Sequence, residues 1–190
     1  MEILDGRKQK QNYHGWMRIA AMVWIVVLAV FSAVWIFQLI NLYFFTDEQL
    51  LPDDPDTQLI KSKIQLGTAF HGVLIVLQLA AFVGLRGKSR AGWTIAFGVF
   101  LTTMAFAGLW LLERYIIIVT SLHKDWLPSS SYLVMELWQY PETYILCGSL
   151  FSAAIMLTRT TRYVFKPKWH SFLVSLFLSA FLIIVATRIF

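Results

Sequence analysis

The chain has 190 residues, of which 58% are hydrophobic and 14% are charged, and its formal net charge is +5. A soluble domain of this size would have too little polar surface to stay in solution, so the composition predicts an all-α polytopic membrane protein. Nucleic-acid binding is not expected either, because the positive charge comes with no basic reading element.

Five apolar segments are expected to form transmembrane helices, bundled in a single integral membrane domain that covers residues 1–190. Each segment is near or above the roughly 17–25 residues that a spanning helix needs. The connections between them leave no room for an independent soluble domain. The segments are Met17–Phe45, Ile64–Leu85, Ala91–Thr120, Pro141–Thr158 and Ser171–Thr187.

The first segment, Met17–Phe45, is far longer than the roughly 7–15-residue apolar core of a signal peptide. No small-residue cleavage site follows it. We therefore expect this segment to remain in the protein as a membrane anchor.

The second segment contains the polar residues of greatest interest. His71 and Gln78 lie two helical turns apart and therefore share one face. Polar groups at membrane depth are costly, which makes them the default functional candidates. We expect His71 to face protein, either as a neutral ring bonded to Thr102, Thr103 or Ser149, or as a group that binds a ligand.

Haem bound through His71 is the one cofactor that the sequence leaves open. A second axial ligand would be needed, and His14 and His170 are expected on the opposite side of the membrane, which leaves only His123. No metal site is predicted, since no metal-binding motif occurs. The single cysteine, Cys147, excludes an intrachain disulfide.

The third segment combines a packing face with two charges. Gly98 and Thr102 lie one turn apart, a spacing typical of helices whose backbones approach closely. Glu113 and Arg114, near the end of the segment, complete the candidate intramembrane polar site with His71 and Gln78. A solvated helix end is the alternative interpretation of these two charges.

The connection Trp126–Pro141 has apolar residues at helical spacing, so we expect a short interfacial helix on the outer leaflet. The fourth segment follows at once and opens with Pro141. Because this segment is short, a re-entrant element is the alternative to a full span.

The fifth segment has a regular stripe of small polar residues. Ser171, Ser175 and Ser179 repeat every four residues and predict a helix-packing face. This face contacts either another helix of the same chain or another subunit.

Most of the 16 Lys and Arg residues lie on alternate connections, which predicts the membrane orientation. The N-terminus is expected in the cytoplasm and, with five spans, the C-terminus outside. The membrane is expected to be a bacterial-type cytoplasmic (plasma) membrane. The basic residues are Arg7, Lys8, Lys10, Arg18, Arg86, Lys88, Arg90, Arg159, Arg162, Lys166 and Lys168.

No motif of a metalloprotease, a nucleotide-binding loop or a Ser-His-Asp hydrolase occurs, so an enzyme of a familiar type is not expected. The leading hypothesis is a non-enzymatic subunit or accessory component of a membrane complex, or a homo-oligomer. Its partners would be the lipid bilayer and either other membrane subunits or further copies of the chain. The alternatives are a small oligomeric transporter or channel, and a membrane-embedded enzyme or redox subunit that handles a lipid or a quinone.

Overall fold

The computed structural model describes the backbone of residues 2–49, 55–121, 137 and 139–189, and the side chains of 15–45, 56–120, 137 and 139–189. Over these ranges the chain is helical and has no strand, which confirms the predicted all-α class. The helices are α1 (Glu2–Gln49), α2 (Pro55–Arg86), α3 (Arg90–Ser121), α5 (Pro141–Leu157), α6 (Arg159–Phe165) and α7 (Trp169–Ile189).

Four of the described helices are long and apolar enough to cross a membrane, and one is shorter. The shorter helix is α5, with 17 residues, which corresponds to about 25 Å. Large apolar side chains such as Val83 and Phe177 point outward and are exposed, as expected of a membrane protein. The four long stretches are Gly15–Phe45, Asp56–Arg86, Arg90–Thr120 and Trp169–Ile189.

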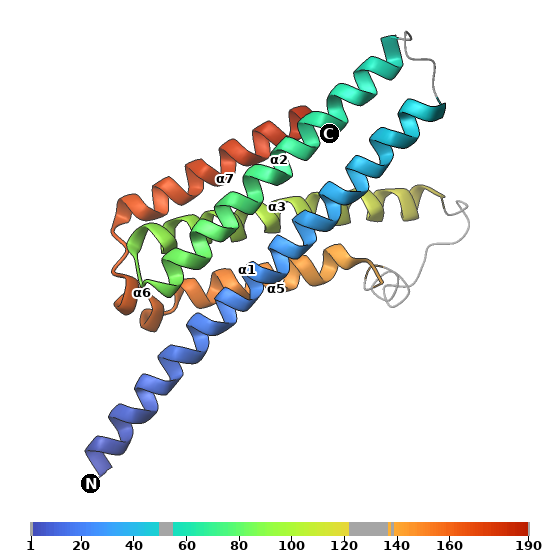
Figure 1. Cartoon of the computed structure of the whole chain (residues 1–190). Helices are drawn as coiled ribbons and strands as arrows, with labels where there is room; N and C mark the ends of the chain where they lie inside the picture. Colours follow the sequence, from blue (N-terminus) through green and yellow to red (C-terminus); the bar gives the residue numbers. More distant parts are fainter. Residues whose placement is uncertain (1, 50–54, 122–136, 138, 190) are drawn as a thin grey trace.

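The helices form a bundle in which α3 is central. It packs against α2, α5 and α7, while α1 lies mainly along α2. Figure 1 shows that α1 and α2 run together and diverge from α3 and α5 with distance from the α2–α3 connection. The first turns of α1 extend beyond the rest of the bundle in the same view (Figure 1).

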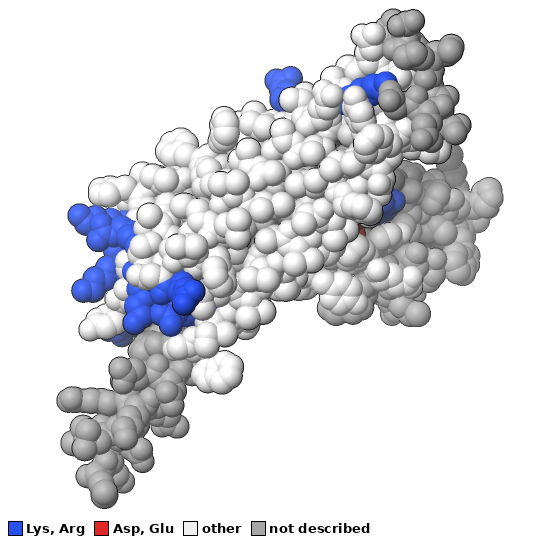
Figure 2. All heavy atoms as spheres, viewed as in Figure 1, with Lys and Arg blue, Asp and Glu red and all other residues white. Residues whose placement is uncertain are grey.

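We call the end that carries the α2–α3 and α5–α7 connections the basic end, and the end where α3 finishes and α5 begins the distal end. Figure 2 shows Lys and Arg side chains gathered at the basic end. The two basic connections are joined directly, because Arg90 Nε donates a hydrogen bond to the Lys166 carbonyl oxygen at 3.1 Å.

The α2–α3 connection is a compact helix-ending turn. Lys88 adopts the left-handed conformation (φ 54°). The amide of Ser89 donates to the Gly84 carbonyl at 2.9 Å, and the amide of Lys88 donates to the Leu85 carbonyl at 3.2 Å. These two bonds form a Schellman motif, which satisfies carbonyls at the end of α2. The Ser89 hydroxyl then accepts from the Gly92 amide at 2.9 Å and begins α3.

This turn brings the backbones of α2 and α3 into direct contact. A Cβ atom added to Gly84 would overlap the backbone of Gly92, and one added to Gly92 would overlap the backbone of Gly84. Only glycine at both positions permits this approach, which sets the starting distance between the two helices.

The basic half of the bundle, meaning the half next to the basic end, has a tightly packed core. Trp93 is fully buried on α3, and its indole N–H donates to the Met156 carbonyl of α5 at 3.2 Å. Trp24 of α1 lies flat against Gly148 of α5, where an added Cβ would overlap the indole ring. The buried core residues are Ala21, Ile25, Leu28, Ala81, Leu85, Trp93, Ala96, Phe97, Val99, Phe100, Ala153, Met156 and Phe165.

The serine stripe of α7 is used inside the chain. Ser171, Ser175 and Ser179 are buried, and Ser175 Oγ donates to the Thr94 carbonyl of α3 at 2.8 Å. A Cβ added to Gly98 would lie 3.3 Å from the Ser175 carbonyl oxygen, so the small residues of α3 and α7 face each other. The structure therefore places the stripe in an intramolecular contact.

One short helix is not predicted from the sequence, and one predicted helix lies almost entirely outside the part of the chain that the structure describes. The short helix α6, which Thr158 caps by accepting from the Thr161 amide, is not predicted from sequence. The interfacial helix expected at Trp126–Pro141 lies almost entirely outside the described residues. It therefore stays a prediction.

We expect Gly84→Ala to destabilise the protein by about 1–3 kcal/mol, because the new methyl group meets backbone atoms that cannot rotate away. Gly72→Ala in the same helix is the matched control. Nothing lies within 4 Å of a Cβ at Gly72, so this change should be neutral or slightly stabilising through helix propensity. Thermal unfolding in a mild detergent measures both variants, and equal midpoints would contradict the proposed close contact.

Candidate functional site

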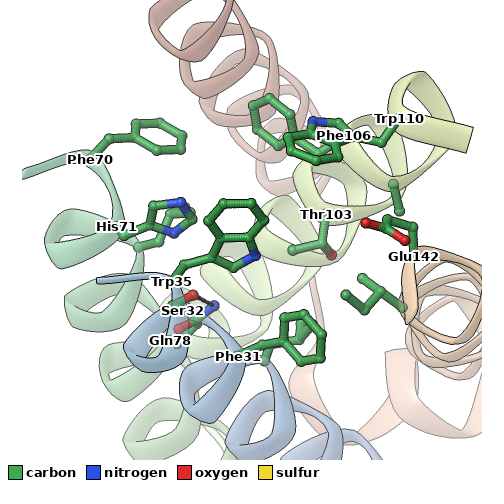
Figure 3. A pocket seen from close by; sticks show the side chains of 14 residues that line it. Phe31, Ser32, Trp35, Phe70, His71, Gln78, Thr103, Phe106, Trp110 and Glu142 are labelled. Carbon is green, nitrogen blue, oxygen red and sulfur yellow. Dashed lines mark hydrogen bonds between the residues drawn. The ribbon is translucent and has the colours of Figure 1, made fainter. Parts of the chain in front are cut away.

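A cavity of about 160 Å³ lies between α1, α2, α3 and α5. It lies between the packed core and the distal end, where the helix pairs diverge (Figures 1 and 3). Its walls are mostly apolar and aromatic, with a few polar side chains. The lining residues are Leu28, Phe31, Ser32, Trp35, Phe70, His71, Leu74, Gln78, Thr103, Phe106, Ala107, Trp110, Glu142 and Ile145.

Aromatic rings from three helices form one wall of the cavity. Trp35 of α1 stacks on His71 of α2, with ring centroids 6.0 Å apart and planes 2° from parallel. Trp110 of α3 meets Trp35 edge to face at 5.5 Å. Phe70 contacts both His71 (5.8 Å) and Phe106 of α3 (6.0 Å), again edge to face. Such contacts prefer defined ring geometries, so they fix where the indole faces lie.

The side of the cavity nearest the core carries a buried amide. Gln78 is 1% exposed, and its Nε2 donates to Ser32 Oγ of α1 at 3.3 Å (Figure 3). Its Oε1 is buried and has no hydrogen-bond partner among the described residues. A buried acceptor left unpaired costs about 1–3 kcal/mol. A hydrogen-bond donor on a bound molecule would offset this cost.

A second polar cluster ties three helices together beside the cavity. Thr103 Oγ1 of α3 donates to Ser149 Oγ of α5 at 2.9 Å. Trp24 Nε1 of α1 donates to the same oxygen at 3.2 Å. Thr102 donates to the Gly98 carbonyl of its own helix at 2.9 Å. Each of the three hydroxyls expected to bond to His71 thus makes another hydrogen bond, and the ring contacts of the imidazole are with Trp35 and Phe70.

A carboxylate lines the cavity from the start of α5. Pro141 opens this helix and places Glu142 in its first turn, where the helix dipole favours a negative charge. In Figure 3 the Glu142 carboxylate points from α5 toward the side where Thr103 and Trp110 lie. Its Oε2 is buried and has no hydrogen-bond partner among the described residues.

Glu142 lies well below the end of α3. The bond from Trp93 to Met156 places these two residues at one level near the basic end. Glu142 is about 20 Å from that level along α5, whereas α3 continues about 40 Å to Thr120. The carboxylate therefore lies close to the middle of the neighbouring long helix, which agrees with Ala107 as its fellow lining residue.

The residues that the sequence predicts for the polar site separate into two groups. His71 and Gln78 both line the cavity. Glu113 and Arg114 are exposed and do not line it. The Arg114 guanidinium lies over the Tyr140 ring at 5.4 Å.

Glu142 is the site residue that the sequence analysis does not include. On sequence it belongs with the acidic residues of the connections, because it is the second residue of its segment. The available signal is the Pro-Glu pair directly before an apolar run, which marks a carboxylate at the start of a helix. The depth of that helix start, however, is set by the packing of α5 on α3.

The described part of the chain contains no group of three or more His, Cys, Asp or Glu side chains that could hold a metal ion. His170 is exposed near the start of α7, at the basic end. The side chain of His14 and all of His123 lie outside the described residues. Haem bound through His71 therefore stays a prediction.

The arrangement is suited to holding a molecule. The cavity combines aromatic faces, an imidazole, a carboxylate oxygen and an amide oxygen, and the two oxygens are buried acceptors with no partner within the described ranges. Pockets of this kind, with apolar walls and a few convergent polar groups, are typical of ligand sites.

We expect the double variant Ser32→Ala/Gln78→Leu to be as stable as the unaltered protein or more stable. It removes both partners of one hydrogen bond together with an unpaired acceptor, and such replacements are nearly neutral or stabilising. Leu74→Ala, at a buried position on the same wall, should cost about 2–5 kcal/mol. Thermal unfolding distinguishes the two, and a double variant that loses as much stability as Leu74→Ala would show that the amide is structural.

Comparisons with known proteins give no further guide to the function of this cavity. No family model, no curated protein and no solved structure matches the chain. Function is therefore argued from the chemistry of the site itself.

Proposed function

We propose that this chain is a multi-pass integral membrane protein that binds a small amphipathic molecule in the cavity between α1, α2, α3 and α5. It acts as a binding or accessory component and does not itself catalyse a reaction. The observation that carries the proposal is a pair of buried acceptors, Gln78 Oε1 and Glu142 Oε2, on the walls of one largely aromatic cavity. Neither oxygen has a hydrogen-bond partner in the part of the chain that the structure describes.

The composition of the walls supports an amphipathic ligand. Trp35, Phe70, Phe106 and Trp110 offer aromatic faces to an apolar body. A hydrogen-bond donor on the same molecule would bind to these two oxygens. Such a bond offsets the desolvation cost of a buried acceptor. A purely apolar molecule would leave that penalty in place.

The packing next to the cavity supports binding over a continuous pore. Trp93, Phe97 and Phe100 are buried in the core of the basic half and fill the space between helices on that side of the cavity. A conducting path would need a route through these side chains or between separate copies of the chain.

The serine stripe no longer argues for a partner subunit, because α3 covers it. The opposite face of α7 carries exposed apolar side chains such as Phe177 and Phe181, which suit contact with lipid or with another membrane protein. A partner subunit or a homo-oligomer could bind this face without touching the cavity lining, because no residue of α7 is among the lining residues.

For orientation we propose that the basic end faces the cytoplasm of a bacterial-type cell, with the protein in the plasma membrane and the N-terminus inside. Arg86, Lys88, Arg90, Arg159 and Arg162 are all exposed at this end. Exposed basic residues on short connections favour the cytoplasmic side. The C-terminus of α7 would then lie outside.

We expect Ala107→Phe to abolish ligand retention, because Ala107 lines the cavity and the added ring would occupy it. Ala180→Phe, at an exposed position on α7, is the control for adding a ring to the protein. Native mass spectrometry of the proteins released from detergent counts the small molecules that each chain retains. Equal retention by the unaltered protein and Ala107→Phe, or no retention by either, would contradict binding in this cavity.

Cysteine labelling tests the orientation in a background that lacks the native thiol, Cys147→Ala, since Cys147 is exposed. A membrane-impermeant maleimide should label Asp56→Cys in intact cells and Lys88→Cys only after permeabilisation, because the two positions lie at opposite ends of α2 and its connection. Labelling of Lys88→Cys in intact cells would reverse the proposed orientation.

A further inference from the structure

We propose that the molecule held in the cavity is an organic cation, with an ammonium group near Glu142 and the indole rings and an aromatic or apolar body among the remaining walls. The proposal rests on the proposed function, because it names the ligand class of the same cavity. It follows from the charge, the ring chemistry, the second acceptor and the size of the site.

The cavity wall carries a carboxyl group that has no cationic partner among the described residues. Glu142 Oε2 is buried, and no Lys, Arg or His among the described residues forms an ion pair with this side chain. Arg114 is at the same end of the bundle but packs on the Tyr140 ring. Burying a carboxylate oxygen without a partner is costly, and a ligand cation beside it offsets that cost.

The indole rings that line the same cavity as this carboxylate are suited to the same ligand. Trp35 and Trp110 line the cavity, and indole is the aromatic group that attracts cations most strongly. The edge-to-face contact of the two rings, at 5.5 Å and 75°, turns their faces in different directions around the cavity. A cation among them would gain both ring attraction and the carboxylate charge.

The two buried acceptors favour some ligand classes over others. Gln78 Oε1 and Glu142 Oε2 are both acceptors. A quinone or a phosphate group would bring further acceptors and leave both oxygens unsatisfied. A molecule that carries N–H or O–H donors and a positive charge complements both.

The size of the cavity limits the ligand to about one ring and its head group. A dry cavity of about 150 Å³ in another protein accommodates benzene, and the present cavity is about 160 Å³. A benzylammonium is the kind of group that fits this volume, with any longer apolar chain extending toward the distal end.

Benzylammonium and ethylbenzene form a matched pair of probes, because they have nearly the same shape and differ in the charged nitrogen and its N–H donors. Binding of each radiolabelled probe to the purified full-length protein is measured by equilibrium dialysis in an uncharged detergent. Ala107→Phe protein serves as the blank for uptake into micelles. Glu142→Gln removes the charge with little change of shape, and Glu113→Gln at an exposed position on α3 is the control.

We expect the cation to bind the unaltered protein and the Glu113→Gln variant alike. In Glu142→Gln its Kd should rise about tenfold or more, and ethylbenzene should bind the unaltered protein at least about tenfold more weakly than the cation. Circular dichroism establishes that each variant is folded, and the two probes compared on the unaltered protein test the proposal without any substitution.

Equal affinity for the two probes, or no specific binding of the cation, would overturn the assignment of a cationic ligand. The proposed function is decided separately, by the molecules that the unaltered protein and Ala107→Phe retain on purification. A retained neutral molecule together with equal probe affinities would therefore reject the cation and keep the binding cavity.

Discussion

The whole structure depends on close backbone contact between helices in the basic half of the bundle. Lipid tails are as apolar as leucine, so burial alone does not drive helices together inside a membrane, and packing decides their association. Here Gly84 and Gly92 bring α2 against α3, and Gly148 admits the Trp24 ring between α1 and α5. Helices held this closely at one end diverge toward the other, and large rings such as Trp35 line the space that results.

The hydrogen bonds at the boundary between core and cavity orient the helices. Ser149 accepts from both Trp24 and Thr103, so three helices meet at one oxygen. Each interhelical bond in a membrane is worth only about 0.6–2 kcal/mol. These bonds mainly orient the helices. Because the two donors share one acceptor, α1, α3 and α5 must each be rotated about its axis so that these side chains meet. That rotation turns Thr103 toward the cavity as well as toward Ser149.

Much of the fold is predictable from the sequence because length and hydropathy define helices that must satisfy their own backbone. The apolar runs and the described helices coincide at their centres, while the ends differ. α1 begins at Glu2 and α2 at Pro55, well before the predicted Met17 and Ile64, since no helix-breaking residue stops either helix at the edge of its apolar run. Hydropathy locates a membrane-embedded stretch and says little about how far a helix continues into water.

The sequence predicts the residues of the site only where helical spacing alone determines which side chains share a face. His71 and Gln78 lie two turns apart, so they face one cavity whichever helices surround it. The membership of Glu142 depends on the depth at which α5 begins beside α3, and this depth comes from contacts far along the chain, such as that of Trp93 with Met156. Glu113 is an acid at a helix end that packing leaves exposed. The two carboxylates look alike in sequence and differ only in tertiary position.

The length of α5 has a consequence for the surrounding lipid. A helix of 17 residues, about 25 Å, lies beside helices whose apolar stretches run for 31 residues, in a bilayer whose apolar layer is about 30 Å thick. A span shorter than the apolar layer is accommodated by thinning of the bilayer, by snorkelling of flanking residues or by association with other helices. Since α5 is attached to the basic end through α6, a local thinning would fall at Pro141 and Glu142. Headgroups there would dip toward the cavity and offer amphipathic molecules a sideways route from the leaflet.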